Sequence, residues 1–122
     1  MKKILIVEDV EINLDLLVQL LEDQFQLVIA GDGAAGVELA HVAKPDLIIM
    51  DMSLPVLDGW SATHAIRTDP ETADIPVIAL SAHAMNAEKQ RALDAGCSAY
   101  LTKPVDEGLL FKTIDELIKV NA

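Results

Sequence analysis

Polar side chains follow four short apolar runs of this chain, and together they could carry out phosphoryl chemistry. The runs span residues 4–7, 47–50, 77–80 and 99–102, and the side chains that follow them are Glu8 and Asp9, Asp51, Ser81, and Lys103. If the runs are parallel strands, their carboxyl ends meet at one edge of an open sheet, where ligands usually bind. Carboxylates, a hydroxyl and an ammonium group at one edge predict a site for Mg²⁺ and a phosphoryl group.

The three acids are suited to hold a magnesium ion, which prefers oxygen ligands and keeps several of its waters. We expect Asp9 and Asp51 to be direct ligands and Glu8 to hold a metal-bound water. The backbone carbonyl of Ser53 could supply a further oxygen, and Mn²⁺ could take the place of Mg²⁺. Without a cation, repulsion among the acids should strain the site and raise the pKa of one of them.

Asp51 can also act as a nucleophile and form an aspartyl-phosphate. Such a transfer depends on positioning and charge neutralisation. Lys103 can neutralise one phosphoryl oxygen, and Ser81 can donate a hydrogen bond to another. Each residue alone is ordinary at a strand end, but the set as a whole indicates function.

The composition favours one globular domain and excludes several kinds of partner. The chain has 122 residues, 52% of them hydrophobic, and a net charge of −11 from 9 basic and 20 acidic residues. Direct binding to nucleic acid or to an anionic membrane surface is therefore not expected. Cys97 has no partner for an internal disulfide, and the apolar run after Met1 is too short for a signal peptide or a membrane span. We expect a soluble cytoplasmic protein.

The elements that would position these residues alternate regularly along the chain. Apolar runs predict strands near residues 3–7, 26–30, 47–51, 77–81 and 99–102, and helical periodicity predicts helices near 11–23, 34–43, 59–67, 86–95 and 106–119. Asp106 is a plausible cap for the last helix. Successive βα units predict an α/β protein with a parallel, doubly wound sheet that carries helices on both faces.

Several segments together resemble the receiver domain of two-component response regulators. They span residues 4–9, 45–51, 54–59, 75–82 and 96–104, and the resemblance extends over essentially the whole chain. It implies a flavodoxin-like fold with five strands in the order 2-1-3-4-5. It also implies that Asp51 accepts a phosphoryl group from phosphohistidine on a sensor histidine kinase or histidine phosphotransfer protein. Glu8 and Asp9 would be the acidic pair for Mg²⁺, and the chain looks most similar to single-domain receivers and to receivers of hybrid kinases.

The resemblance further implies a switch, in which phosphorylation draws the Ser81 hydroxyl inward and Tyr100 rotates into the vacated space. Ala82 would bind the phosphoryl group beside Ser81, and the Lys103–Pro104 peptide bond would be cis. Ser53 and His83 occupy positions that tune phosphate hydrolysis in relatives. Partners would then read the face formed by the fourth helix, the fifth strand and the fifth helix, through which a homodimer could also form.

The first predicted helix carries a second apolar stripe beyond its core face. Ile12, Leu16 and Leu20 share the side opposite Leu17 and Leu21. Two interpretations remain open, since the stripe could be covered by the last helix or could dock a kinase.

We expect residues 1–122 to form a single receiver domain without an effector domain, acting by protein contacts and not as a turnover enzyme. One alternative is a phosphorylation-independent binding module, although such proteins commonly lose one of the key residues. A small aspartyl-phosphate phosphatase is less favoured, because those enzymes carry a second acid where Ser53 stands. A flavin-binding protein is least favoured, since Glu8 and Asp9 would repel a phosphate anion.

Overall fold

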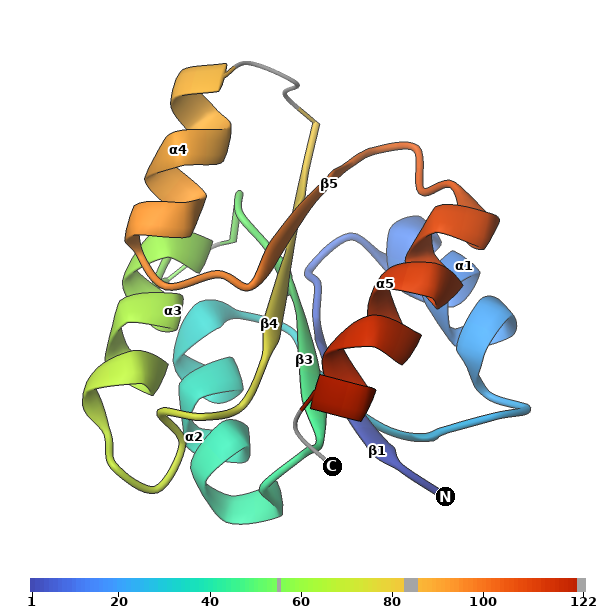
Figure 1. The fold of residues 1–122 in the computed structure, drawn as a ribbon, viewed down its shortest axis with the longest axis horizontal. Helices are drawn as coiled ribbons and strands as arrows, with labels where there is room; N and C mark the ends of the chain where they lie inside the picture. Colours follow the sequence, from blue (N-terminus) through green and yellow to red (C-terminus); the bar gives the residue numbers. More distant parts are fainter. Residues whose placement is uncertain (55, 83–85, 121–122) are drawn as a thin grey trace.

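A computed structural model describes residues 1–54, 56–82 and 86–120 of the chain, which form a parallel sheet covered by helices on both faces (Figure 1). The strands are β1 (Lys3–Val7), β2 (Gln26–Ala30), β3 (Leu47–Asp51), β4 (Val77–Ser81) and β5 (Ala99–Thr102). The helices are α1 (Glu11–Leu21), α2 (Gly33–Ala43), α3 (Gly59–Thr68), α4 (Asn86–Asp94) and α5 (Glu107–Val120). Among these described residues, no helix has the length and apolar character that a bilayer span requires.

The strands pair in the order β2-β1-β3-β4-β5, and every pairing is parallel. The predicted fold class and strand order are therefore confirmed. β3 and β4 are buried along their whole length, which explains why their sequences read as continuous apolar runs without alternation. The sheet order changes direction at β1 and β3, so the carboxyl ends of these two strands border a crevice where ligands bind in folds of this kind.

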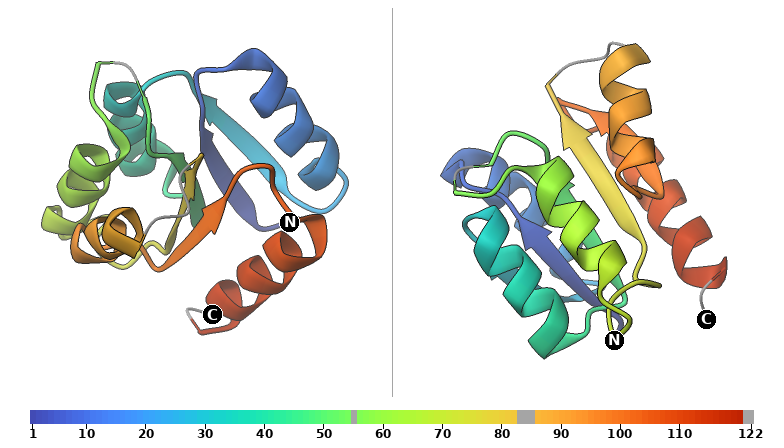
Figure 2. Two further views of the ribbon diagram at one scale, coloured as in Figure 1. Left: turned by 90° about the horizontal axis from the view of Figure 1, so that it is seen from above. Right: turned by 90° about the vertical axis from the view of Figure 1, so that its left-hand side faces the viewer.

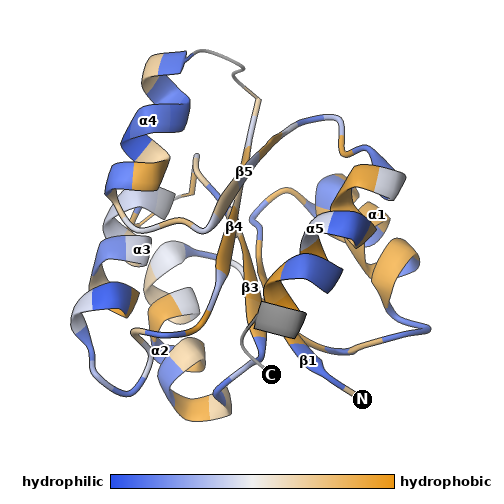
Figure 3. Ribbon diagram, in the orientation of Figure 1, coloured by the Kyte–Doolittle hydropathy of each residue, from blue (hydrophilic) through white to orange (hydrophobic). Residues whose placement is uncertain are grey.

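The sheet separates two hydrophobic cores, and alternate residues of each strand enter different ones. Ile4 and Ile6 of β1 pack with α1 and α5, whereas Leu5 and Val7 pack with the helices of the other face. Figure 2 shows α1 and α5 on one side of the sheet and α2, α3 and α4 on the other. Apolar residues concentrate on the central strands, and the outer surface of α4 is largely polar (Figure 3).

Side-chain caps fix where three of the helices begin. The Asp32 and Asp58 carboxylates accept the backbone N–H groups of Ala35 and Ser61, both at 2.8 Å. Asp106 accepts the N–H of Leu109 at 2.9 Å, which confirms its predicted role at the start of α5. The main departure from the predicted boundaries is α1, which ends at Leu21 and not at residue 23.

Gly59 allows α3 to begin directly against the end of β3. A Cβ atom at this position would lie 2.5 Å from the backbone oxygen of Asp51 and 2.7 Å from the Cα of Met52. Both atoms belong to the backbone, so they could not move aside without displacing the strand end. The close approach therefore holds the segment that follows Asp51 in place.

Candidate functional site

The paired ends of β1 and β3 bring the three predicted metal-binding acids together. Val7 of β1 is in register with Met50 of β3, so Glu8 and Asp51 follow side by side. Ligand atoms of Glu8, Asp9 and Asp51 all lie within 4.8 Å of one another. Glu8 and Asp51 are buried, with 2% and 3% of their surface exposed, whereas Asp9 faces solvent. One side of the cluster is thus dry and the other is open to an incoming group.

Lys103 supplies the positive charge of this cluster from the segment after β5. Its backbone N–H donates to the carbonyl of Ser81 at 2.8 Å, which attaches the segment to the end of β4. Its side-chain Nζ lies 3.1 Å from Oε1 of Glu8 and 3.3 Å from Oδ1 of Asp51. The Lys103–Pro104 peptide bond is cis, in agreement with the expectation from the sequence.

These contacts give the two buried acids different protonation behaviour. Burial raises the pKa of Glu8 to about 7, aided by a hydrogen bond to Asp51 and its charge, and Lys103 only partly opposes this rise. Burial would also raise the pKa of Asp51, but hydrogen bonds from Glu8 and from the N–H of Ser53, with the ammonium of Lys103, lower it overall. The expected rise in the pKa of one acid is therefore present, and that acid is Glu8.

The ammonium group of Lys103 stays charged in this setting. Burial by itself would lower the pKa of Lys103, but its hydrogen bond to Glu8 and the charges of Asp51 and Glu8 raise it overall. An ionised Asp51 next to a fixed cation can both bind a divalent metal ion and attack an electrophilic phosphorus. The arrangement therefore has the charges that phosphoryl transfer requires.

Comparison with known proteins identifies the family of the chain. The family model of the response regulator receiver domain matches residues 4–115. The chain belongs to this family. It is 37% identical over 114 residues to the polar-differentiation response regulator DivK of Brucella anthropi, covering 93% of each chain, and equally identical to DivK of Brucella abortus.

Solved receiver structures share the fold of this receiver over nearly its full length. The receiver domain of the sensor histidine kinase PA1611 from Pseudomonas aeruginosa is 34% identical, with a TM-score of 0.91 and coverage of 97% of this chain and 98% of that one. That protein holds a magnesium ion in its active-site cleft. The chemotaxis response regulator CheY4 of Vibrio cholerae is 27% identical, with a TM-score of 0.89 and coverage of 96% and 98%.

The predicted switch residues of the receiver lie on β4 and β5. Ser81 is buried at the end of β4, and Ala82, which follows it, is exposed. Tyr100 of β5 is in register with Ala79 of β4, and its half-buried ring packs against the core on the α2–α3–α4 side. Both predicted switch side chains thus belong to neighbouring strands, as a coupled movement would require.

Two predicted positions concern the loops beside Asp51 in the receiver. Ser53 is exposed, and its backbone N–H donates to Oδ1 of Asp51 at 3.2 Å. The backbone carbonyl of Ser53, the predicted metal ligand, belongs to the same short turn that this hydrogen bond closes. His83, expected to tune hydrolysis, lies outside the described residues.

The second apolar stripe of α1 was expected either to be covered by the last helix or to dock a kinase, and its residues differ in how buried they are. Leu20 is half-buried and packs against the core that contains Leu110 and Ile114 of α5. Ile12 and Leu16 remain exposed, at 76% and 44% of their surface. The Leu20 end of the stripe thus packs into the core that α1 shares with the last helix, and the end nearer to Glu8 is open.

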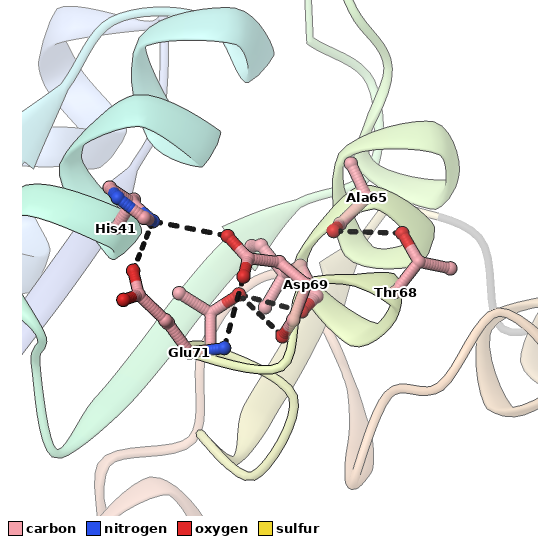
Figure 4. Close-up of polar contacts among 7 residues, drawn as sticks. His41, Ala65, Thr68, Asp69 and Glu71 are labelled. Carbon is pink, nitrogen blue, oxygen red and sulfur yellow. Dashed lines mark hydrogen bonds and ion pairs between the residues drawn. The ribbon is translucent and has the colours of Figure 1, made fainter.

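One cluster was missed by the sequence analysis, which assigned no role to His41. His41 of α2 meets Asp69 and Glu71, which lie in the loop after α3 (Figure 4). The acids are two positions apart, which is a weak signal on its own, and nothing local links them to a histidine 28 positions earlier.

Proposed function

We propose that this receiver accepts a phosphoryl group on Asp51 from phosphohistidine of a sensor histidine kinase or a histidine phosphotransfer protein. The observation that carries the proposal is the position of Asp51, buried and ionised, between the Glu8–Asp9 pair and the ammonium of Lys103. A carboxylate oxygen of Asp51 attacks phosphorus, the P–N bond to the histidine breaks, and the imidazole leaves as the neutral base after taking up a proton. Receiver domains as a family accept phosphoryl groups from such proteins.

The acids of the site fit a divalent cation. Asp9 and Asp51 would bind Mg²⁺ directly, Glu8 through a water, and the backbone carbonyl of Ser53 would complete the protein ligands. Bound there, Mg²⁺ would neutralise charge that develops on the phosphoryl oxygens. Mn²⁺ has the same preference for oxygen ligands and should substitute for it. Glu8 must lose its proton to serve the cation, because its pKa is raised in the metal-free cluster.

After transfer, three groups would recognise the phosphoryl oxygens. Lys103 would exchange its contact with Asp51 for one with the phosphoryl group. Ser81 would donate a hydrogen bond from its hydroxyl group, and the exposed Ala82 would lie beside it. Movement of Ser81 would open space toward Tyr100 on the neighbouring strand, and the altered face of α4, β5 and α5 would select the downstream partner.

We further propose that the protein signals through this change and does not turn over a substrate. Water would reset it by attacking the phosphorus of the aspartyl-phosphate, and the Asp51 carboxylate would leave. Ser53 is exposed next to Asp51 and is placed to affect access of that water. His83 is proposed for the same role from its sequence position alone.

The docking surface that we propose for the kinase or phosphotransfer protein is the open end of the α1 stripe. Ile12 and Leu16 are exposed there, and Leu16 also lines a small cavity of about 70 Å³ together with Glu8 and Lys103. A partner helix bound on this surface could bring its phosphohistidine to Asp51. Leu20 is half-buried and packs against the core that contains residues of α5, so it would contribute less to binding than Ile12 and Leu16.

As in the sequence-based prediction, we propose that residues 1–122 act as one receiver domain. We propose that a homodimer could form through the α4–β5–α5 face. We also propose that the protein works in the cytoplasm.

Intact mass after incubation with acetyl phosphate and Mg²⁺ tests the proposal. The expected result is one added phosphoryl group, absent in Asp51→Asn and in EDTA. Asp23→Asn, which changes an exposed acid in the turn after α1, serves as the matched control and should be modified like the wild type. No adduct, together with no change of Trp60 fluorescence on addition of beryllofluoride, would instead favour a phosphorylation-independent binding module.

A further inference from the structure

A second group of metal-ligating side chains lies on the α2–α3 side of the sheet, outside the phosphoacceptor site. Nδ1 of His41 lies 3.1 Å from Oδ2 of Asp69 and 3.1 Å from Oε2 of Glu71. The three ligand atoms all lie within 4.8 Å of one another. In Figure 4, His41 projects from α2 toward the loop after α3, where both carboxylates point back at its ring.

We propose that His41, Asp69 and Glu71 form a binding site for a divalent transition-metal ion, with Zn²⁺ as its best-suited occupant.

The distances between the ligand atoms fit a shared ion. Two ligands bound about 2.1 Å from zinc at a near-tetrahedral angle are separated by roughly 3.2–3.4 Å. The two separations of 3.1 Å from the His41 nitrogen are close to this value. Three protein ligands with a water in the fourth position is a common arrangement for zinc.

A direct hydrogen bond or ion pair between His41 and the two carboxylates explains their positions less completely than a shared metal ion does. Nδ1 of an imidazole carries at most one proton, so it can donate fully to only one of the two carboxylates. The ammonium of Lys44 also attracts Asp69. A dication centred among the three ligand atoms would neutralise both carboxylates at once.

The loop that carries the acids is held in place by hydrogen bonds within it and to α3, which favours a preorganised site. Oδ1 of Asp69 accepts the N–H of Glu71 at 3.0 Å, and this contact turns Oδ2 toward His41. The Thr72 side chain is buried and donates to the carbonyl of Ile66 at 2.7 Å. Arg67 donates to the carbonyls of Ala73 and Ile75, so the loop is tied to α3 at both ends.

The surroundings leave room for water ligands and an entry path. The side chains of His41, Asp69 and Glu71 are 52%, 37% and 53% exposed. Glu71 also lines a hollow of about 220 Å³ that is acidic, with Asp46 and Asp74 in its wall. A cation would therefore be attracted to this end of the molecule and could keep one or more waters.

The ligand set distinguishes this site from the one at Asp51. Mg²⁺ prefers an all-oxygen environment and is seldom bound through imidazole, whereas Zn²⁺ accepts nitrogen and oxygen together. The Glu8–Asp9–Asp51 cluster contains oxygen ligands alone, so magnesium in excess should occupy that cluster and leave the histidine-containing one to zinc. Bound zinc would join α2 to the α3–β4 loop.

Zinc titration by isothermal calorimetry in excess Mg²⁺ tests the inference, with His41→Ala as the main variant. His64→Ala is the matched control, because His64 is also an exposed helical histidine but lies outside the cluster. The wild type and His64→Ala should bind one zinc ion that His41→Ala does not bind, or binds at least tenfold more weakly. Asp51→Asn should retain this ion.

Thermal unfolding gives a second readout. Zinc should raise the melting temperature of the wild type and of His64→Ala, and it should leave that of His41→Ala unchanged. Asp69→Asn keeps the size of the side chain and weakens the ligand, so it repeats the test if His41→Ala fails to fold. Equal zinc binding by His41→Ala, Asp69→Asn and His64→Ala would overturn the proposal and leave a plain ion pair.

Discussion

Nζ of Lys103 lies 3.1 Å from Oε1 of Glu8, although 95 positions of sequence separate the two residues. The contact joins the segment after β5 to the end of β1, across the ends of β3 and β4. It places a cation against two buried carboxylates. Lys103 helps Asp51 to remain ionised, whereas burial and the neighbouring Asp51 raise the pKa of Glu8 although Lys103 opposes this rise. The same ammonium is therefore available when Asp51 acquires negatively charged phosphoryl oxygens.

Removal of this ammonium in Lys103→Met should slow phosphorylation of Asp51 by about 10²-fold, since one preorganised electrostatic contact of this kind is typically of that size. The measurement is the rate of mass gain with acetyl phosphate and Mg²⁺. Lys112→Met, which changes an exposed lysine of α5, should react at the wild-type rate. An unchanged rate in Lys103→Met would exclude Lys103 from the transfer step.

The raised pKa of Glu8 predicts an unusual pH dependence in metal-free buffer. The folded pKa is about 7 and the ordinary value is 4.5, so between them the folded protein binds more protons at Glu8 than the unfolded chain does. The free energy of unfolding should therefore fall as pH rises through this window, by on the order of 1–3 kcal/mol. The lowered pKa of Asp51 acts in the opposite direction, but only at more acidic pH.

Urea unfolding in EDTA at pH 5.0, 6.0 and 7.5 measures this effect. Glu8→Gln should remove the slope, because a glutamine has no proton to lose, and Glu11→Gln on the exposed start of α1 should keep it. Mg²⁺ should stabilise the wild type more at pH 7.5 than at pH 5.0, since the cation and the proton compete for the same acids. A metal-free stability that rises steadily with pH over this range would contradict the assignment.

Gly59→Ala should destabilise the protein by about 1–3 kcal/mol, because its Cβ would overlap backbone atoms of Asp51 and Met52. The matched control is Gly108→Ala on α5, where the nearest atom to an added Cβ is the side-chain oxygen of Asp106 at 3.5 Å. This control should be neutral or stabilising by up to about 1 kcal/mol, as expected for alanine in a helix. Chemical denaturation compares the two, and similar stabilities would show that the strand end can adjust.

Arg67→Ala should lower the free energy of unfolding by about 2–4 kcal/mol, since charged hydrogen bonds to partly buried carbonyls are among the stronger ones. The guanidinium donates to the carbonyls of Ala73 and Ile75 before β4 and to that of Gly96 before β5. Arg91→Ala, which removes an arginine stacked 4.0 Å over the ring of Trp60, should cost only about 0.5–1 kcal/mol. Equal losses in urea unfolding would mean that Arg67 does not tie these loops together.

The helices, the strands and the residues at the phosphoacceptor edge could be predicted from the amino-acid sequence alone. Apolar runs such as 47–50 and 77–80 predict their strands because burial on both faces leaves no room for polar alternation. Since parallel strands end at the same edge, the acids and the lysine that follow these runs could be placed together without coordinates. The Asp106 cap is equally local, as it joins groups three positions apart.

How these groups affect one another, and which surfaces stay open, depends on contacts between distant parts of the chain. Sequence predicted that one acid of the cluster would be strained, but the identification of Glu8 depends on its burial and on its distances to Asp51 and Lys103. Whether α5 covers the α1 stripe depends on the angle and distance between two helices, and the answer differs for Leu20 and Leu16. The meeting of His41 with Asp69 and Glu71 arises from the packing of α2 beside the end of α3, and such contacts between distant segments leave no periodic signal in the chain.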